Sequence, residues 1–463
     1  MVQRGLATGP AESGLSLVCF HSLAEARPWH RELDELNLCS ARPDPFSTFD
    51  FLEHYHEYDE EYPGGTGYTL WLLVVFRDDV PVGYLPLKHL EGQFLGLPVS
   101  KLTFLVLHDT DRPHLVARCE DELEVAAACL AWLQQRVDQW DLLEFHQQDR
   151  NSPLAALAPH WSRRQYRLAS WECHENATIR MRWPTLAEYY AELSANLRST
   201  LARQTRRLTE TGRTEVVSTR DPASLPALFE LYLDLESRSW KARAGAGVTR
   251  SALREDYMRA LLANPRILGI DLKILLLDGQ PISGIMTGTF AGNRYLLQLA
   301  YDASLARLGP GSPMLALCMR DSILEGNREF NLLNGFATYK SRWLADVTPT
   351  RVIQVYRRGR MPDWRRRCGD FARSVRDVAE QQWSRLARRA NRTSIPSRAN
   401  PSRWEVEQSA ADGVTVPAWT PPSPERRQEV EALLSRAARA GRMERLATED
   451  WLRFMPGKQF RPG

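Results

Sequence analysis

The chain has 463 residues, of which 43% are hydrophobic and 25% are charged. At about 100–200 residues per domain, this length predicts two domains and additional segments. No apolar run reaches the ~18 residues that a membrane span requires, and the first residues lack the apolar core of a signal peptide. We therefore expect a soluble, cytoplasmic protein.

Several classes of function lack their signature motifs. The seven cysteines are scattered without C-x-x-C spacing, so neither a disulfide framework nor a zinc site is predicted, and we expect no metal. A G-x-S-x-G elbow, a G-x-x-x-x-G-K-[ST] loop and an H-E-x-x-H motif are all missing. This argues against the common serine hydrolases, P-loop nucleotide hydrolases and zinc proteases.

The net charge of +3 hides an asymmetry between the two parts of the chain. Residues 1–150 carry 11 basic and 25 acidic side chains, and residues 151–463 carry 49 and 32. All ten histidines lie at or before His174. Any catalysis confined to the second half must therefore proceed without histidine.

The first segment, 1–180, alternates the signals of strands and helices. Residues 71–90 predict a hairpin with a turn at 77–80, and 102–107 predict a short strand. Apolar residues at helical spacing follow in 121–137, and 140–147 return to a strand.

The second segment, 181–358, shows the same kind of alternation. Helices are predicted over 185–212 and 227–243, then a strand, turn and strand over 271–292 with Asp278-Gly279 as the hairpin signal. A strand at 294–302, a helix at 312–327 and a strand at 330–335 complete the segment.

Two stretches match at an offset of 200 residues. Pro81-Val82 and Gly83 correspond to Pro281-Ile282 and Gly284, and each stretch continues with strand, amphipathic helix and strand. The shared order of four elements indicates a duplicated α/β domain.

The composition changes after Arg358. Residues 359–392 predict a basic helix, 393–424 a flexible linker rich in Pro and Ser, and 425–463 a helical segment. Ser423 and Gly441 are the expected cap and stop of that last helix. The helix over 364–392 is expected to contact an anionic membrane or protein surface, which would place the protein at the periphery of the inner membrane. The acidic first domain of the same chain is the alternative partner.

The first candidate binding motif is the turn Gly309-Pro310-Gly311-Ser312, which follows a strand and begins a helix. Free backbone N–H groups and the positive end of the helix dipole at such a turn suit a pyrophosphate. An ordinary turn with Ser312 as N-cap is the structural alternative.

The second candidate site is the cluster that follows the break at Asn334-Gly335. Tyr339, Lys340, Arg342 and Trp343 lie within five positions, after a strand end where α/β proteins bind ligands. Tyr339 is a candidate proton donor and Lys340 a candidate anion anchor. Packing of Tyr339 and Trp343, with Lys340 and Arg342 solvated, is the alternative.

Two more stretches are candidates for substrate contacts. A basic helix at 196–208 carries Arg206 and three further arginines, and it either binds an anion or is a solvated face. Trp240 and Lys241 close a helix that precedes a loop rich in Gly and Ala, which is either a substrate lid or a plain connection.

Taken in order, these motifs resemble the GNAT-like acyltransferases of the CelD/BcsL cellulose-biosynthesis type, which are related to the FemAB peptidyltransferases. The matching stretches are 206–212, 236–241, 275–284, 300–302, 310–315 and 330–343, with 45–55, 78–87 and 140–147 in the first half. The resemblance covers about 45–358 and explains nothing after 360. It implies an α/β (α+β) chain of two tandem GNAT-like domains, each a central mixed sheet flanked by helices, with a helical and partly disordered C-terminal tail.

The resemblance also implies an activity. A typical GNAT enzyme binds acetyl-CoA where two strands diverge, with the pyrophosphate at a helix start. Gly309, Gly311 and Ser312 stand where the family has its Gly-rich loop, so acetyl-CoA or another acyl-CoA is the expected co-substrate.

Candidate roles in acyl transfer follow. Asp302 and Glu236 are the candidate bases, Tyr339 is the proton donor, and a backbone N–H between Arg294 and Asp302 would polarise the thioester. The expected substrate contacts are Lys340, Trp240, Lys241, Asn334, Trp343 and Arg206.

Three functions remain open at this point. The first is acyl transfer from acyl-CoA to an amine or hydroxyl of a small molecule or saccharide, such as a precursor of an exopolysaccharide or of cellulose. The second is FemAB-like aminoacyl transfer from a charged tRNA, and the third is a non-catalytic scaffold of a polysaccharide-synthesis complex. Specific DNA binding is not expected.

Overall fold

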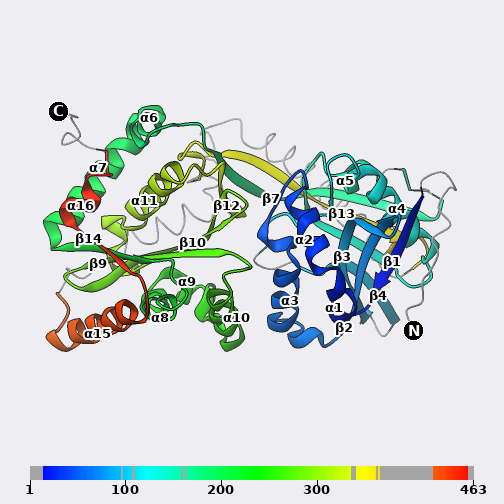
Figure 1. Ribbon diagram of the computed structural model, residues 1–463, viewed down its shortest axis with the longest axis horizontal. Coiled ribbons are helices and arrows are strands. Elements are labelled where there is room, and N and C mark those ends of the chain that lie inside the picture. Colours follow the sequence, from blue (N-terminus) through cyan, green and yellow to red (C-terminus); the bar gives the residue numbers. More distant parts are fainter. Residues whose placement is uncertain are drawn as a thin grey trace, which may run out of the picture.

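One continuous sheet runs through the whole molecule in the computed structural model (Figure 1). The structure describes residues 14–94, 97–106, 110–157, 160–161, 164–334, 340–360, 363–364 and 421–456. Within these ranges the sheet has 14 strands, in the order β1-β2-β3-β4-β6-β13-β7-β12-β11-β10-β9-β8-β14, with β5 paired to β3.

Helices lie on both faces of this sheet. The elements of the first half are β1 (Leu15–Phe20), α1 (Leu23–Ala26), α2 (His30–Leu38), α3 (Phe49–Tyr58), β2 (Tyr68–Arg77), β3 (Val80–Phe94), β4 (Leu97–Phe104), β5 (Val116–Ala117), α4 (Glu122–Gln135), β6 (Leu142–Gln148), α5 (Pro153–Leu157) and β7 (Tyr166–Arg180).

The remaining elements are α6 (Leu186–Glu192), α7 (Ala195–Thr211), β8 (Thr214–Thr219), α8 (Leu225–Ser237), α9 (Trp240–Arg243), α10 (Ala252–Ala263), β9 (Gly269–Leu277), β10 (Gln280–Phe290), β11 (Asn293–Tyr301), α11 (Gly311–Leu324), β12 (Glu329–Asn334), β13 (Asp346–Arg357), α15 (Pro424–Ala440), β14 (Glu444–Ala447) and α16 (Thr448–Leu452).

The two halves repeat one topology. In the first, β1 to β4 pair antiparallel in sequence and β4 pairs parallel with β6; in the second, β8 to β11 pair antiparallel and β11 pairs parallel with β12. Both hairpins turn on two residues with positive φ, Asp78-Asp79 and Asp278-Gly279. A bulge then follows at Val82 and at Ile282, so the predicted offset of 200 residues is confirmed in detail.

Each half takes its last strand from the other half. β7, which ends the first half, pairs with β12, whereas β13, from the end of the second half, pairs with β6. β7 and β13 also pair with each other along most of their length. The two mixed sheets are thereby joined into one, and the division at residue 180 remains a prediction.

Two predicted helices are interrupted. The helix expected over 185–212 breaks at Leu193-Ser194, because the Ser194 side chain caps α7 by accepting the N–H of Leu197. Arg198 donates to the carbonyl groups that end α6, which stabilises the break. The helix expected over 227–243 is likewise divided at Ser239, which caps α9.

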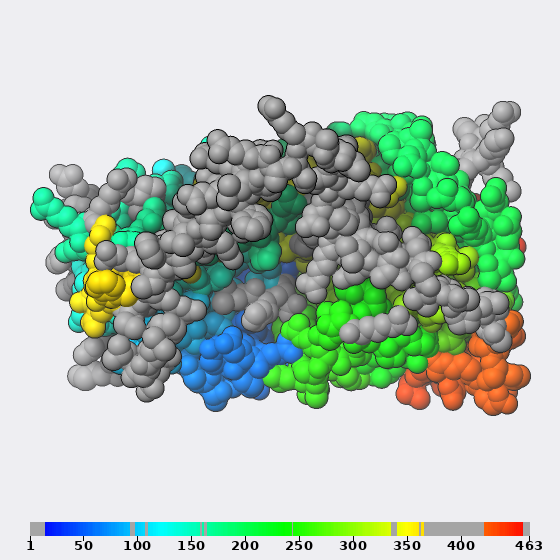
Figure 2. Space-filling model, turned by 180° about the vertical axis from the view of Figure 1, so that it is seen from behind, coloured from blue at the N-terminus to red at the C-terminus, as the bar shows by residue number. Residues whose placement is uncertain are grey.

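Three apolar clusters form the core. One lies under α4 in the first half, and one lies under α7 and α11 in the second. The third joins the halves on the other face of the sheet, where Phe46 meets Tyr295 at a ring distance of 5.8 Å. Seen from behind, the blue α3 region adjoins the green α10 region, where Glu60 pairs with Arg250 (Figure 2).

The end of the chain is part of the second half. The predicted helix with Ser423 as cap and Gly441 as stop is confirmed as α15, which packs on α8 through Val430 and Leu434. β14 extends the sheet by pairing with β8. The basic helix predicted over 364–392 and most of the linker predicted over 393–424 lie outside the described residues.

Candidate active site

The strands β11 and β12 diverge after a short parallel ladder. Only Asn293, Arg294 and Tyr295 pair with β12, opposite Glu329, Phe330 and Asn331. Both strands then continue without pairing to each other, and β11 carries a bulge at Leu297, where its register with β10 shifts. Backbone groups of β11 beyond Tyr295 consequently face the region between the two strands.

The N-terminus of α11 lies at the end of β11. Gly309 has φ of +63°, in the left-handed region that favours glycine, and an added Cβ there would lie 2.0 Å from the Gln204 side chain. Gly311 is the first residue of α11 and lies against Tyr301. No side chain caps this helix and its first turn holds no acidic residue, so its positive end is available to an anion.

Glu236 and Lys241 form a buried ion pair beside β11. The Lys241 Nζ lies 3.7 Å from Glu236 Oε1 and donates to Gln298 Oε1 at 2.6 Å. Glu236 is fully buried and accepts the backbone N–H groups of Val248 and Thr249. The carboxylate therefore anchors the loop after α9, and burial lowers the pKa of Lys241.

Trp240 precedes Lys241 in α9, and Asp302 follows the last residue of β11. Trp240 is 43% exposed. Asp302 accepts the N–H of Ser304, which begins the turn after β11, and pairs with Arg238 at 3.0 Å. These contacts fix the connection from β11 towards α11, and the proposed role of Asp302 as a base stays a prediction.

The end of β12 is held by Lys340. Its ammonium donates to the carbonyls of Leu332, Leu333 and Asn334 at 2.6, 2.9 and 2.9 Å. Only 3% of Lys340 is exposed, so the alternative in which this side chain is solvated does not hold, and its role as an anion anchor stays a prediction. Burial lowers its pKa to about 8, and the three carbonyl groups use all three of its donors.

The other candidate residues of the site lie in different parts of the second half. Trp343 packs in the core under α11, and its carbonyl accepts the Tyr189 hydroxyl. Asn334 lies at the end of β12 and donates to Gln147 of the first half. Tyr339 lies outside the described residues. Arg206 is on the exposed face of α7, paired with Glu210 at 3.6 Å.

The structure thus places Glu236 and Lys241 beside Gln298 of β11 and Asp302 directly after that strand, where it pairs with Arg238. Gly309, Gly311 and Ser312 follow at the start of α11. Asn334 and Lys340 mark the end of β12. Asp111 was not predicted as a site residue, yet its carboxylate accepts from Asn331 of β12 at 2.9 Å. A polar run after the strand predicted at 102–107 was the available signal.

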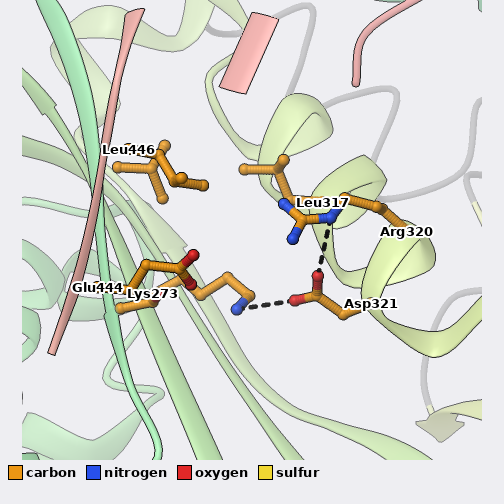
Figure 3. A pocket seen from close by; sticks show the side chains of 8 residues that line it. Lys273, Leu317, Arg320, Asp321, Glu444 and Leu446 are labelled. Carbon is orange, nitrogen blue, oxygen red and sulfur yellow. Dashed lines mark ion pairs between the residues drawn. The ribbon is translucent and has the colours of Figure 1, made fainter. Parts of the chain in front are cut away.

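A buried network of charges attaches the other end of α11 to the sheet. Lys273 of β9 contacts Asp321 of α11 at 2.8 Å (Figure 3). It also contacts Asp271 at 3.0 Å. Arg294 of β11 is fully buried and pairs with Asp271 and with Glu325. Helix α11 is therefore held at its C-terminal half by ion pairs, while its N-terminus faces the diverging strands.

These features define a class of fold. The family description "Acetyltransferase (GNAT) domain" matches residues 195–341, a range that contains the diverging strands and α11. The chain accordingly has a mixed α/β, GNAT-type acyltransferase fold.

Solved structures of several other proteins are similar to this chain. The chain is similar to FemX at 11% identity and a TM-score of 0.50, over 70% of this chain and 95% of that chain. It is also similar to the C-terminal domain of a putative lysylphosphatidylglycerol synthetase from Agrobacterium fabrum, at 14% identity and a TM-score of 0.43, over 77% and 96%.

A third similar structure is a tandem GNAT protein from the clavulanic acid biosynthesis pathway, at 12% identity and a TM-score of 0.41, over 75% and 99% of the two chains. At these identities the likeness concerns the fold. A comparison with curated proteins found no match.

Two further findings concern membrane spans and metal sites in the described part of the chain. Its helices include none that is long and apolar enough to cross a membrane. The same residues hold no group of three His, Cys, Asp or Glu side chains that suits a metal ion.

Proposed function

We propose that the chain transfers an acyl group from acetyl-CoA or another acyl-CoA to an amine or hydroxyl acceptor. The observation that carries this proposal is the uncapped N-terminus of α11 at the point where β11 and β12 diverge. A diphosphate there would meet the backbone N–H of Gly311 and the positive end of a 14-residue helix, whereas Pro313 has no N–H and that of Ser312 donates to the Gly309 carbonyl.

The residues around this terminus fit a diphosphate. Gly311 adds no side chain, so an anion can approach the backbone closely, and Ser312 is only partly buried. In the first half the corresponding helix α4 begins with Asp121, Glu122 and Glu124, which would repel an anion. The second half is therefore the half in which we place the acyl-CoA.

The remaining residues take roles around the thioester. Backbone N–H groups near the bulge at Leu297 would polarise its carbonyl, and Gln298 is held beside them by Lys241 and Glu236. We propose Trp240 and Asn334 as contacts of the acceptor, and Arg206 and Trp343 as more distant supports. Tyr339 is proposed as the proton donor to the departing thiolate, with Asp302 or Glu236 as base.

A saccharide acceptor, such as a precursor of an exopolysaccharide or of cellulose, belongs to the CelD/BcsL resemblance. Its support is the ordered likeness of motifs in 206–343 and the exposed Trp240, because aromatic rings bind the apolar faces of sugars. This acceptor, a cytoplasmic site and a peripheral membrane contact through 364–392 remain parts of the proposal.

Calorimetric titration of the full chain with acetyl-CoA, a long-chain acyl-CoA and free coenzyme A tests the central claim. We expect at least one thioester to bind with a dissociation constant below ~1 mM, the upper range of typical KM values. A chain that is folded by circular dichroism but binds none of the three ligands at that concentration would overturn the proposal.

A FemAB-like aminoacyl transfer from a charged tRNA is the second candidate. It is favoured by Arg203, Arg206 and Arg207, which are exposed on α7, the helix that contacts the turn before α11. Binding of tRNA that falls steeply between 50 and 200 mM salt, without binding of any acyl-CoA, would support it. A chain that binds neither ligand but retains a protein partner through 359–463 would be the non-catalytic scaffold.

A further inference from the structure

Two exposed cysteines of the first half lie next to each other, although they are 80 positions apart in the chain. Cys39 is the residue that ends α2, and Cys119 lies in the turn that precedes α4. The Cys119 thiol donates to the carbonyl oxygen of Cys39 at 3.9 Å. Among the described cysteines these are the two that are exposed, so the fold places the two accessible thiols together.

The segments that carry the two thiols run side by side. Helix α2 packs on β5, which ends two residues before Cys119. The backbone N–H of Ala41 faces the Glu122 carboxylate, so the contact continues beyond the two cysteines. It therefore does not depend on a single hydrogen bond.

The distance between the two cysteines suits a disulfide. A carbonyl oxygen lies about 2.4 Å from its own Cα atom, so the sulfur atom of Cys119 is within roughly 6 Å of the Cys39 Cα atom. A disulfide joins Cα atoms about 4.4–6.8 Å apart. Rotation of the two exposed side chains is consequently the main movement that a bridge requires.

The other described cysteines are protected from reaction. Cys129 and Cys318 are fully buried, and burial raises the pKa of the Cys318 thiol to about 12. Burial likewise raises the pKa of Cys19 to about 12, and Cys173 is partly buried. Because the thiolate is the form that attacks a disulfide, a buried and protonated thiol reacts slowly. An oxidant should therefore react first with the exposed pair.

A bridge at Cys39 would hold the segment through which the two halves meet. The carbonyl of Pro43 accepts the hydroxyl of Tyr295 at 3.3 Å, and the Phe46 ring packs against the same tyrosine. Both residues follow Cys39 within one short segment between α2 and α3. A covalent link would fix the start of this segment to the turn before α4.

We propose that Cys39 and Cys119 form a reversible disulfide on reaction with a low-molecular-weight disulfide such as oxidised glutathione. The thiolate of one cysteine attacks the oxidant, breaks its S–S bond and releases one thiol. The second thiolate attacks this mixed disulfide, forms the S–S bond of the protein and releases a second thiol. Two electrons pass from the protein to the oxidant, and the two protons end on the released thiols. The site is independent of the acyl-transfer proposal.

The bridge is expected to be labile. Exposed disulfides are open to attack by reducing thiols, and such bridges serve as redox-dependent rather than permanent links. Both cysteines are free thiols in the structure. Formation of the bridge should therefore follow the ratio of oxidised to reduced thiol in the surroundings.

Peptide mapping of the full chain tests the proposal. The chain is equilibrated in glutathione buffers of increasing oxidised fraction, and the remaining thiols are blocked with N-ethylmaleimide before digestion. We expect a cross-linked pair of peptides that holds Cys39 and Cys119, and its loss in reduced glutathione. Separate glutathione adducts on the two residues, a bridge to a different cysteine, or two unmodified thiols at every ratio would overturn the proposal.

Melting curves of three variants locate the effect. The bridge closes a loop of about 80 residues, so oxidation should raise the melting temperature of the parent chain by about 3–5 °C. Cys39→Ser and Cys119→Ser should both fold, because the positions are exposed, and each should lose the cross-linked peptides and the rise. Cys173→Ser, the same change outside the pair, should keep both. A rise of parental size in either pair variant would contradict the assignment.

Discussion

The two halves share a topology but attach their long helices to the sheet differently. In the first, Trp132 is the eleventh residue of α4 and meets Trp71 of β2 at a ring distance of 5.5 Å. In the second, the eleventh residue of α11 is Asp321, and residue 271, which is 200 positions after Trp71, is the buried Asp271. In the second half two carboxylates stand in place of this apolar contact, and Lys273 bridges them at 3.0 and 2.8 Å.

The N-termini of the two helices also differ, but here the first half is the charged one. α4 begins with acidic residues, and Arg77 pairs with Asp121 at 2.8 Å and with Glu124 at 2.6 Å. α11 begins with Gly311 and has no charged group in its first turn. The half with an ionic anchor thus leaves its helix terminus open, and this is the half in which we propose the acyl-CoA site.

The largest expected effect concerns the ionic anchor. Arg294→Met should destabilise the chain by ~3–5 kcal/mol, because Asp271 and Glu325 lose a buried partner. Urea denaturation followed by tryptophan fluorescence measures the change. Arg206→Met, at an exposed pair on α7, is the matched control and should stay within ~0.5 kcal/mol. Equal effects would show that the network adds nothing to the anchor of α11.

The second prediction concerns pH at the junction of the halves. Burial, the largest cause, raises the pKa of Asp44 from 3.8 to about 6, so its contribution to stability is present below pH 3.8 and is lost as pH rises through 6. Asp44→Asn should remove up to ~3 kcal/mol of this pH dependence. Denaturation of parent and variant at pH 4, 5, 6 and 7 measures the difference, and parallel curves would contradict the shift.

A third prediction concerns the two equivalent strand ends. β6 and β12 each have a residue with positive φ near their end, Gln147 in β6 and Leu333 in β12. Only the end of β12 is held by a lysine, Lys340. Lys340→Met should destabilise the chain by ~1–3 kcal/mol, because three carbonyl groups lose their donor. The change in melting temperature measures it, and a cost below ~0.5 kcal/mol would indicate that water replaces the ammonium.

The smallest effect concerns the open helix terminus. Ser312→Glu gives α11 the acidic first turn of α4, and it should weaken acyl-CoA binding at least tenfold, or ~1.4 kcal/mol, through charge repulsion. Because a carboxylate at this position favours the helix, the melting temperature should not fall. Glu124→Gln in α4 is the control and should leave the affinity unchanged. Unchanged binding in Ser312→Glu would move the anion away from α11.

The sequence predicted what local patterns encode. The hairpin at Asp278-Gly279 and the helix at 312–327 correspond to structure, because turn residues and helical periodicity act over a few positions. The exchange of β7 and β13 had no local signal, since a strand pattern does not specify its partner.

The sequence predicted only those residues of the candidate site that lie close to one another in the chain. Gly309, Gly311 and Ser312 lie within four positions of the chain, at one helix start. Asp111 lies 220 positions before Asn331, so their contact depends on how the halves meet. The burial of Lys340 could not be predicted from the sequence either. Only the fold places its ammonium within hydrogen-bond distance of the three carbonyl groups at the end of β12.

The strand exchange has a consequence for how the protein can be divided. A fragment that ends at Arg180 keeps β7 but lacks β13, so β6 and β7 would both expose unpaired edges. A fragment that starts at residue 181 lacks β7, the only described strand that β12 and β13 share. Neither piece should fold independently, but the two expressed together should reassociate, since each supplies the strand that the other is missing.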